Sequence, residues 1–100
     1  MRRYEAIYQE VKDLMESGKP IPSDKLTILD VKTYTPDEIR DIRMVAKMTQ
    51  KTFARVIGVS VKSVEGWERG YSQPEGAARR LIGLIQSNPT FAIDAGIIRQ

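Results

Sequence analysis

Apolar residues recur along most of this 100-residue chain at the three-to-four spacing of helices that bury one face. Over the first seventeen residues the apolar stripe consists of Tyr4, Ile7, Tyr8, Val11, Leu14 and Met15. A glycine and a proline within residues 17–20 end this predicted helix, because glycine closes helices and proline cannot continue them. Such an amphipathic helix needs a partner surface for its apolar side.

The segment 21–34 lacks a helical period. Pro20 precedes it, Pro22 lies at its start, and its residues 26–32 are rich in strand-prone side chains with imperfect alternation. We therefore expect a short strand or an extended arm here.

From Thr35 onward the pattern predicts five helices. Thr35 can cap the first helix, Glu38 can complete a capping box, and Pro36 suits the first helical position. This helix extends to about Lys47 and points Ile39, Ile42 and either Val45 or Ala46 inward. The fourth helix ends near Ser87 and carries Ala77, Ala78, Leu81, Leu84 and Ile85. The last helix begins at Asn88 and Pro89 and carries Phe91, Ala92, Ala95 and Ile98. We predict an all-α fold in which residues 1–34 form a helix and arm and residues 35–100 form a five-helix domain.

Residues 49–70 place caps and glycines at the spacing of a helix-turn-helix. Thr49 and Ser60 can cap two short helices, and Gly58 can supply the left-handed residue between them. So short a turn makes the helices cross at a large angle, which projects the outer face of the second helix. That face carries Val61, Lys62, Ser63, Glu65, Gly66 and Arg69. A helical hairpin whose caps and glycines serve packing alone would show the same spacing.

Composition narrows the possible functions. The sequence contains no cysteine and no histidine, which removes thiol chemistry, the imidazole base and the usual zinc ligands. We therefore expect a protein that is not an enzyme and needs no cofactor. The chain has no apolar run of about 18 residues and no N-terminus of the secretory kind, so we expect a cytoplasmic protein without a membrane partner.

The charges are distributed unevenly. Residues 1–34 contain six basic and six acidic side chains, whereas residues 47–73 contain five basic and two acidic ones. The positive excess coincides with the predicted helix-turn-helix, where a phosphate backbone would lie.

Residues 34 to about 89 resemble the lambda-repressor-like (Xre/Cro-type) helix-turn-helix family. The matching positions are Ile39, Ile42, Arg43, Met48, Thr49, Gln50, Phe53, Ala54, Ile57, Gly58, Val59, Ser60, Ser63, Val64, Trp67, Glu68, Gly70 and Pro74. The resemblance implies that the helix from about Val61 to Arg69 enters the major groove of double-stranded DNA.

The same resemblance assigns roles to individual side chains. Lys62 can donate to guanine, and Glu65 can accept from cytosine or order Lys62. Val61 and Ser63 complete the predicted base-reading set together with Gly66, which either lets the backbone approach the bases or reads nothing. The predicted phosphate contacts are Gln50, at the positive end of its helix, and Lys51, Arg69, Tyr71 and Gln73. The alternative for each is a solvated surface side chain.

Two further roles follow from the resemblance. Arg43 and Glu68 match positions that form a structural ion pair, although two independent surface charges would also fit the sequence. A helix-turn-helix of this size usually binds a pseudo-palindromic site as a dimer. Phe91, Ile93, Ile97 and Ile98 are more apolar residues than one domain face can bury, so we expect the last helix to form a homodimer contact.

The whole chain is similar in architecture to HigA-type antitoxins, which join a short helix and arm to such a domain. That similarity implies neutralisation of a RelE-like, mRNA-cleaving toxin and repression of the chain's own operon. The implied toxin contacts are Tyr4, Ile7, Val11, Leu14, Leu26 and Ile28. Alternatively, the N-terminal helix packs on this chain's own domain or on its dimer mate. Two other functions remain open: a stand-alone transcriptional repressor, and a protein-interaction adaptor without DNA binding, against which Gln50, Lys62 and the basic excess argue.

Overall fold

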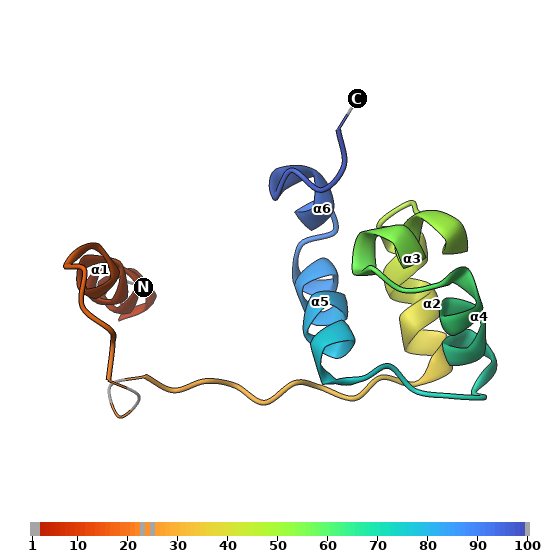
Figure 1. Cartoon of the computed structure of the whole chain (residues 1–100), viewed down its shortest axis with the longest axis horizontal. Coiled ribbons are helices and arrows are strands. Elements are labelled where there is room, and N and C mark those ends of the chain that lie inside the picture. The colour runs from red at the N-terminus through yellow and green to blue at the C-terminus, as the bar shows by residue number, and fades with distance from the viewer. Residues whose placement is uncertain (1–2, 23, 25, 100) are drawn as a thin grey trace. The chain divides into compact units, whose positions relative to one another are not determined.

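A computed structural model describes residues 3–22, 24 and 26–99, and in the first helix it describes the side chains from Ile7 onward. The described residues contain six helices and no strand (Figure 1). The chain divides into two compact units, Met1–Asp30 and Val31–Gln100. This boundary lies four residues earlier than the one expected after Tyr34. The reason is that Tyr34 is buried in the core of the second unit. None of the described helices has both the length and the apolar composition that a bilayer crossing requires.

The first unit contains α1 (Arg3–Glu16), which ends in a turn where Gly18 has a positive φ of 79°. Along the apolar stripe, Ile7 is exposed, and Val11 and Leu14 are half-buried. Tyr4 lies in α1, but its side chain is outside the described residues. The segment 26–30 forms no strand, so it is an extended arm, with Leu26 half-buried and Ile28 exposed.

The second unit begins with α2 (Pro36–Val45), whose capping box is confirmed. The Thr35 hydroxyl accepts from the N–H of Glu38 at 3.1 Å, and the Glu38 carboxylate accepts from the N–H of Thr35 at 2.7 Å. The helix ends two residues earlier than predicted, because Lys47 adopts a left-handed conformation with φ of 62°. The N–H of Met48 then reaches the carbonyl of Arg43, and the Met48 side chain enters the core.

The predicted helix-turn-helix is confirmed in α3 (Gln50–Ile57) and α4 (Val61–Arg69), which Figure 1 shows joined by a short loop. The hydroxyls of Thr49 and Ser60 cap the two helices by accepting from backbone N–H groups three residues later. Gly58 ends α3 with φ of 89°, a conformation that side chains other than glycine adopt only with strain.

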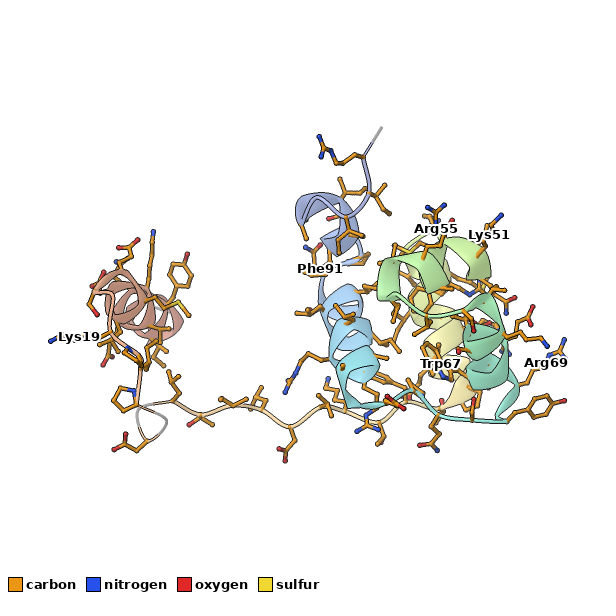
Figure 2. All side chains as sticks on the ribbon, in the orientation of Figure 1. Lys19, Lys51, Arg55, Trp67, Arg69 and Phe91 are labelled. Carbon is orange, nitrogen blue, oxygen red and sulfur yellow. The ribbon has the colours of Figure 1, made fainter. Side chains whose placement is uncertain are left out.

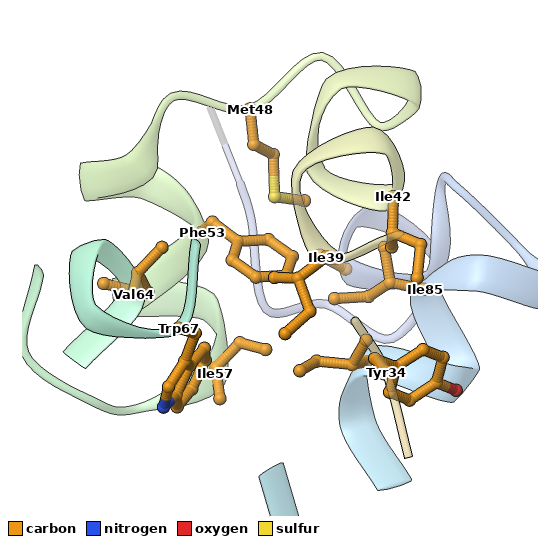
Figure 3. Close-up of a cluster of buried hydrophobic side chains, with 12 residues drawn as sticks. Tyr34, Ile39, Ile42, Met48, Phe53, Ile57, Val64, Trp67 and Ile85 are labelled. Atoms are coloured by element: carbon orange, nitrogen blue, oxygen red, sulfur yellow. The ribbon is translucent and has the colours of Figure 1, made fainter. Parts of the chain in front are cut away.

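A single core joins α2, α3 and α4 to α5 (Gly76–Ser87), and Figure 3 shows its largest side chains converging. The core residues are Tyr34, Ile39, Ile42, Met48, Phe53, Ala54, Ile57, Val64, Trp67, Ile82, Ile85 and Ala92. Ala46, rather than Val45, packs against this core from the end of α2. On α5 the inward positions are Ala78, Leu81, Ile82 and Ile85. Leu84 and Ala77, two of the residues from which this helix was predicted, are exposed, because the buried face of α5 is centred on Ile82, which was not among them.

The last helix, α6 (Phe91–Asp94), is only one turn long. This helix was predicted to begin at Asn88 and Pro89, but it begins at Phe91, and the Asn88 side chain accepts from the N–H of Thr90 and donates to the carboxylate of Asp94. The chain turns at Gly96, whose φ is 77°, so Ala95 is exposed rather than buried. The five helices expected after residue 35 are thus confirmed, with a shorter last member.

Candidate nucleic-acid interface

The outer surface of α4 carries the side chains predicted to read bases. Lys62 and Val61 are exposed in its first turn, and Glu65 is half-buried one turn later. Val64 and Trp67 occupy the opposite side and pack in the core. Figure 2 shows Trp67 directed into the domain, whereas Arg69 projects from the end of the helix. The predicted division of α4 into a buried side and a free side therefore holds.

Two members of the predicted base-reading set have contacts inside the domain. The Ser63 hydroxyl lies 3.0 Å from the Ser60 hydroxyl, so it belongs to the cap of α4. A Cβ atom at Gly66 would lie only 2.9 Å from the hydroxyl oxygen of Ser72, which shows that the glycine leaves room for the following loop. The Gly66 carbonyl also accepts from the N–H of Tyr71 in that loop at 2.9 Å.

The predicted phosphate contacts surround α4. Lys51 is exposed in the first turn of α3, and Arg69, Tyr71 and Gln73 are exposed at the end of α4 and in the loop that follows. Figure 2 shows Arg55 beside Lys51, with both side chains projecting from α3. Arg55 contributes to the basic excess of residues 47–73 but was not among the predicted phosphate contacts, although its position four residues after Lys51 places it on the same side of the helix.

The predicted ion pair between Arg43 and Glu68 is present and bidentate. Arg43 Nε donates to Glu68 Oε2 at 2.7 Å, and Arg43 Nη2 donates to Glu68 Oε1 at 3.0 Å. The remaining guanidinium nitrogen, Nη1, donates to the carbonyl of Met48 at 3.0 Å. The Glu68 side chain is only 3% exposed, so this is a buried pair that joins α4 to α2.

Gln50 belongs to the same cluster, which the sequence did not predict. Its Nε2 donates to Glu68 Oε1 at 3.1 Å. An amide nitrogen carries two hydrogens, so this bond leaves one donor for a phosphate oxygen. The contact therefore orients the Gln50 amide at the start of α3, where the helix dipole already favours an anion.

Arg40 is the second residue that sequence reasoning missed. Its guanidinium donates to the main-chain carbonyl of Glu68 at 3.0 Å and to the carboxylate of Asp37 at 2.8 Å. A signal was present in the sequence, because Arg40 lies three residues before Arg43 and thus on the same side of α2. The described residues contain no group of acidic side chains that could hold a metal ion.

The electrostatics of the cluster keep Glu68 ionised. Burial raises the pKa of Glu68, but hydrogen bonds from Arg43 and Gln50 and the positive charges of Arg43 and Arg40 lower it, and the net pKa is below its ordinary value. The hydrogen bond to Glu68 raises the pKa of Arg43. A buried pair of this kind orients the elements that carry it more than it adds net stability.

Comparison with known sequences agrees with this geometry. The pattern of the helix-turn-helix family matches residues 39–77, which include α3 and α4. The antitoxin HigA-2 of Vibrio cholerae is 32% identical to this chain over an alignment that covers 83% of this chain and 86% of the relative. The uncharacterised helix-turn-helix-type transcriptional regulator YiaG of Escherichia coli K12 is 36% identical over 70 residues, covering 70% of this chain and 72% of the relative.

The pKa of Glu68 leads to a testable pH dependence. Because this pKa is lower in the folded chain than in the unfolded chain, the ionised carboxylate favours folding. Its contribution is complete above the unfolded glutamate pKa of about 4.3 and is lost as the pH falls through the lower folded pKa. Glu68→Gln should therefore lose less unfolding free energy than the wild type as the pH falls below about 4.3, as measured by urea denaturation.

At neutral pH the same substitution should lower the free energy of unfolding by about 3–5 kcal/mol, because it leaves Arg43, whose side chain is only 15% exposed, without its counter-charge. The control is Glu65→Gln, one turn earlier on α4, where the described residues show no ion pair to Glu65. This control should cost less than about 1 kcal/mol. An equal loss in both variants would remove the special role of Glu68.

Proposed function

The chain belongs to the lambda-repressor-like helix-turn-helix family, and from this membership we propose that it is an antitoxin that neutralises a RelE-like, mRNA-cleaving toxin and represses its own operon. The family identifies the chain as a helix-turn-helix DNA-binding regulator. We propose that the second unit, Val31–Gln100, binds the operator and that the first unit, Met1–Asp30, binds the toxin.

In the proposed DNA complex, α4 lies in the major groove. Lys62 donates to a guanine, and Val61, Ser63, Glu65 and Gly66 form the rest of the surface that faces the bases. The phosphate contacts are Gln50, Lys51, Arg69, Tyr71 and Gln73. Support comes from the exposure of Lys62 and from the Gln50 amide, which Glu68 holds at the positive end of α3.

The proposal that this chain binds a toxin is supported mainly by how much of the chain matches the antitoxin. That match covers 83% of this chain, which is more than the 70 residues of Val31–Gln100, so it includes part of the first unit. The match to the transcriptional regulator covers 70% of the chain and need not include the first unit. A likeness that continues into the first unit favours the antitoxin over a stand-alone repressor.

The first unit has the surface properties of a segment that binds a protein. On α1, Ile7 is exposed, and Val11 and Leu14 are half-buried, while Ile28 is exposed in the extended arm. An apolar helical face can fill a groove, and an extended segment can add a strand to the edge of a sheet. We propose that Tyr4, Ile7, Val11 and Leu14 fill such a groove on the toxin while Leu26 and Ile28 belong to the added strand.

We also propose that the regulator acts as a homodimer on a pseudo-palindromic operator. Of the four residues assigned to the dimer contact, Phe91 and Ile98 are half-buried against the chain's own core. Ile93 and Ile97 remain 60% and 47% exposed, so they are the two that offer an apolar surface to a second copy. The proposed contact thus depends mainly on Ile93 and Ile97.

The base-reading role of Lys62 can be separated from simple charge. Lys62→Ala should weaken binding to a duplex selected by the wild type from a random library by about 1–3 kcal/mol, with a smaller effect on unselected DNA. Lys51→Ala is the matched control, and it should weaken both duplexes similarly and reduce the salt slope by about one. Fluorescence anisotropy at several salt concentrations measures both effects. Equal losses on both duplexes for Lys62→Ala would exclude Lys62 from base reading.

Removal of residues 1–30 should leave the melting temperature of the second unit and its DNA affinity unchanged, because the core lies within residues 31–100. The truncated protein should no longer co-purify with the toxin encoded beside its gene or rescue growth from it. If the first unit instead packs on the domain, the melting temperature will fall.

A point substitution makes the same test in the full chain. Leu14→Asp places a charge on the apolar stripe of α1 and should abolish toxin capture. Gln9→Asp introduces the same charge on the exposed opposite side and should retain it. Toxin capture by both Leu14→Asp and the truncated protein would refute the assignment.

Substitutions in the proposed dimer contact should convert the dimer to a monomer without unfolding the chain. Ile93→Asp and Ile97→Asp together should give a monomer by sedimentation at micromolar concentration, because charges replace two exposed apolar side chains. Ala95→Asp is the control and should remain dimeric, because Ala95 is exposed and is not one of the residues assigned to the contact. A wild-type chain that sediments as a monomer would contradict the proposal.

A further inference from the structure

We propose that Arg40 is a positioning residue for DNA recognition, which fixes the C-terminal end of α4 and thereby the placement of Lys62 and Glu65 on the bases. This inference rests on the proposed reading of DNA by α4. Arg40 would act without touching a base, through the helix that carries the base-reading side chains.

The contacts of Arg40 join α2 to the main chain of α4. Its Nη2 donates to the carbonyl oxygen of Glu68 at 3.0 Å, and its Nε lies 3.8 Å from Glu68 Oε1. Its Nη1 donates to Asp37 Oδ1 at 2.8 Å, one turn earlier on α2. The guanidinium is thus held at one end by its own helix and binds the neighbouring helix with the other.

The bonded carbonyl is one that α4 itself leaves unsatisfied. The last four carbonyls of an α-helix have no N–H partner within the helix. At the end of α4, the carbonyls of Gly66 and Trp67 accept from the N–H groups of Tyr71 and Gly70. The Glu68 carbonyl accepts from Arg40 instead, and a positive charge at this end also complements the helix dipole.

Arg40 and Arg43 hold the same residue of α4 at two different points. Arg43 binds the Glu68 carboxylate, which is separated from the helix backbone by rotatable side-chain bonds. Arg40 binds the backbone itself. Val64 and Trp67 pack the inner side of α4 in the core, and the carboxylate pair adds an attachment whose side chain can adjust when the helix tilts. The bond from Arg40 attaches the backbone itself and so restricts the direction of the helix end.

The required precision explains why a second attachment matters. Lys62 lies six residues before Glu68, which is about 9 Å along the helix axis. A tilt of about 10° around the Glu68 end would move Lys62 by about 1.6 Å over that length. Hydrogen bonds to base edges tolerate a spread of only about 0.5 Å, so such a tilt would break the base contacts while many phosphate contacts could readjust.

Arginine is the side chain that this role needs. Its planar guanidinium presents several donors in a fixed fork, so it can bind Asp37 and the Glu68 carbonyl together. Lysine carries the same charge on a single nitrogen at the end of a flexible stem and does not reproduce the fork. Arg40→Lys therefore removes the geometry and keeps the charge.

The test compares a duplex selected from a random library by the wild type with an unselected duplex of equal length. In Arg40→Lys the ratio of the two affinities should fall about tenfold, since a charged hydrogen bond to α4 is lost. Affinity for the unselected duplex and the salt slope should stay unchanged because the charge is kept. Asp37→Asn removes the negative charge of this exposed partner but keeps an oxygen that can accept from Arg40, so it should preserve the ratio.

A stability control separates positioning from a general weakening of the fold. Ile82→Val shortens a buried side chain of α5, away from the Arg40 contacts, and should keep the ratio at a similar loss of melting temperature. An unchanged ratio in Arg40→Lys, or an equal fall in Ile82→Val, would overturn the role of Arg40. If the wild type itself does not discriminate between duplexes, the proposed DNA reading fails before the inference is reached.

Discussion

The carboxylate of Glu68 is withdrawn from water, and a buried charge is tolerated only where hydrogen bonds and an opposite charge compensate it. Its partners come from two other helices: Arg43 belongs to α2, and Gln50 begins α3. Because Glu68 itself belongs to α4, satisfying this single group holds three helices in one arrangement. The orientation of α4 relative to α2 and α3, and hence the whole candidate DNA interface, depends on that arrangement.

The apolar core determines which parts of the chain remain available for partners. Val64 and Trp67 use the inner side of α4, which leaves Lys62 and Arg69 to solvent. Tyr34 packs in the core of the second unit, and its hydroxyl lies 3.4 Å from Oε1 of Gln86 on α5. All residues of this core lie within 31–100, so the second unit has a core of its own.

Part of the candidate site could be predicted because its residues match a known spacing. The pairing of Arg43 with Glu68 was expected from the family resemblance and is confirmed. The bonds from Gln50 and Arg40 to Glu68 were not predicted, since they join residues 18 and 28 positions apart and depend on how closely α2 and α3 approach α4. Spacing along the chain indicates which side of a helix a residue occupies, but not which group on another helix lies within 3 Å of it.

The sequence by itself determined the starts and stops that depend on neighbouring residues. The caps at Thr35 and Ser60 and the left-handed turn at Gly58 form within three or four residues, so their chemistry is complete in the local sequence. Only the tertiary structure decided that α2 ends before Lys47 and that α5 buries Ile82. Lys47 has no local preference for its left-handed conformation, and it adopts that conformation where the turn carries Met48 into a core built from distant parts of the chain.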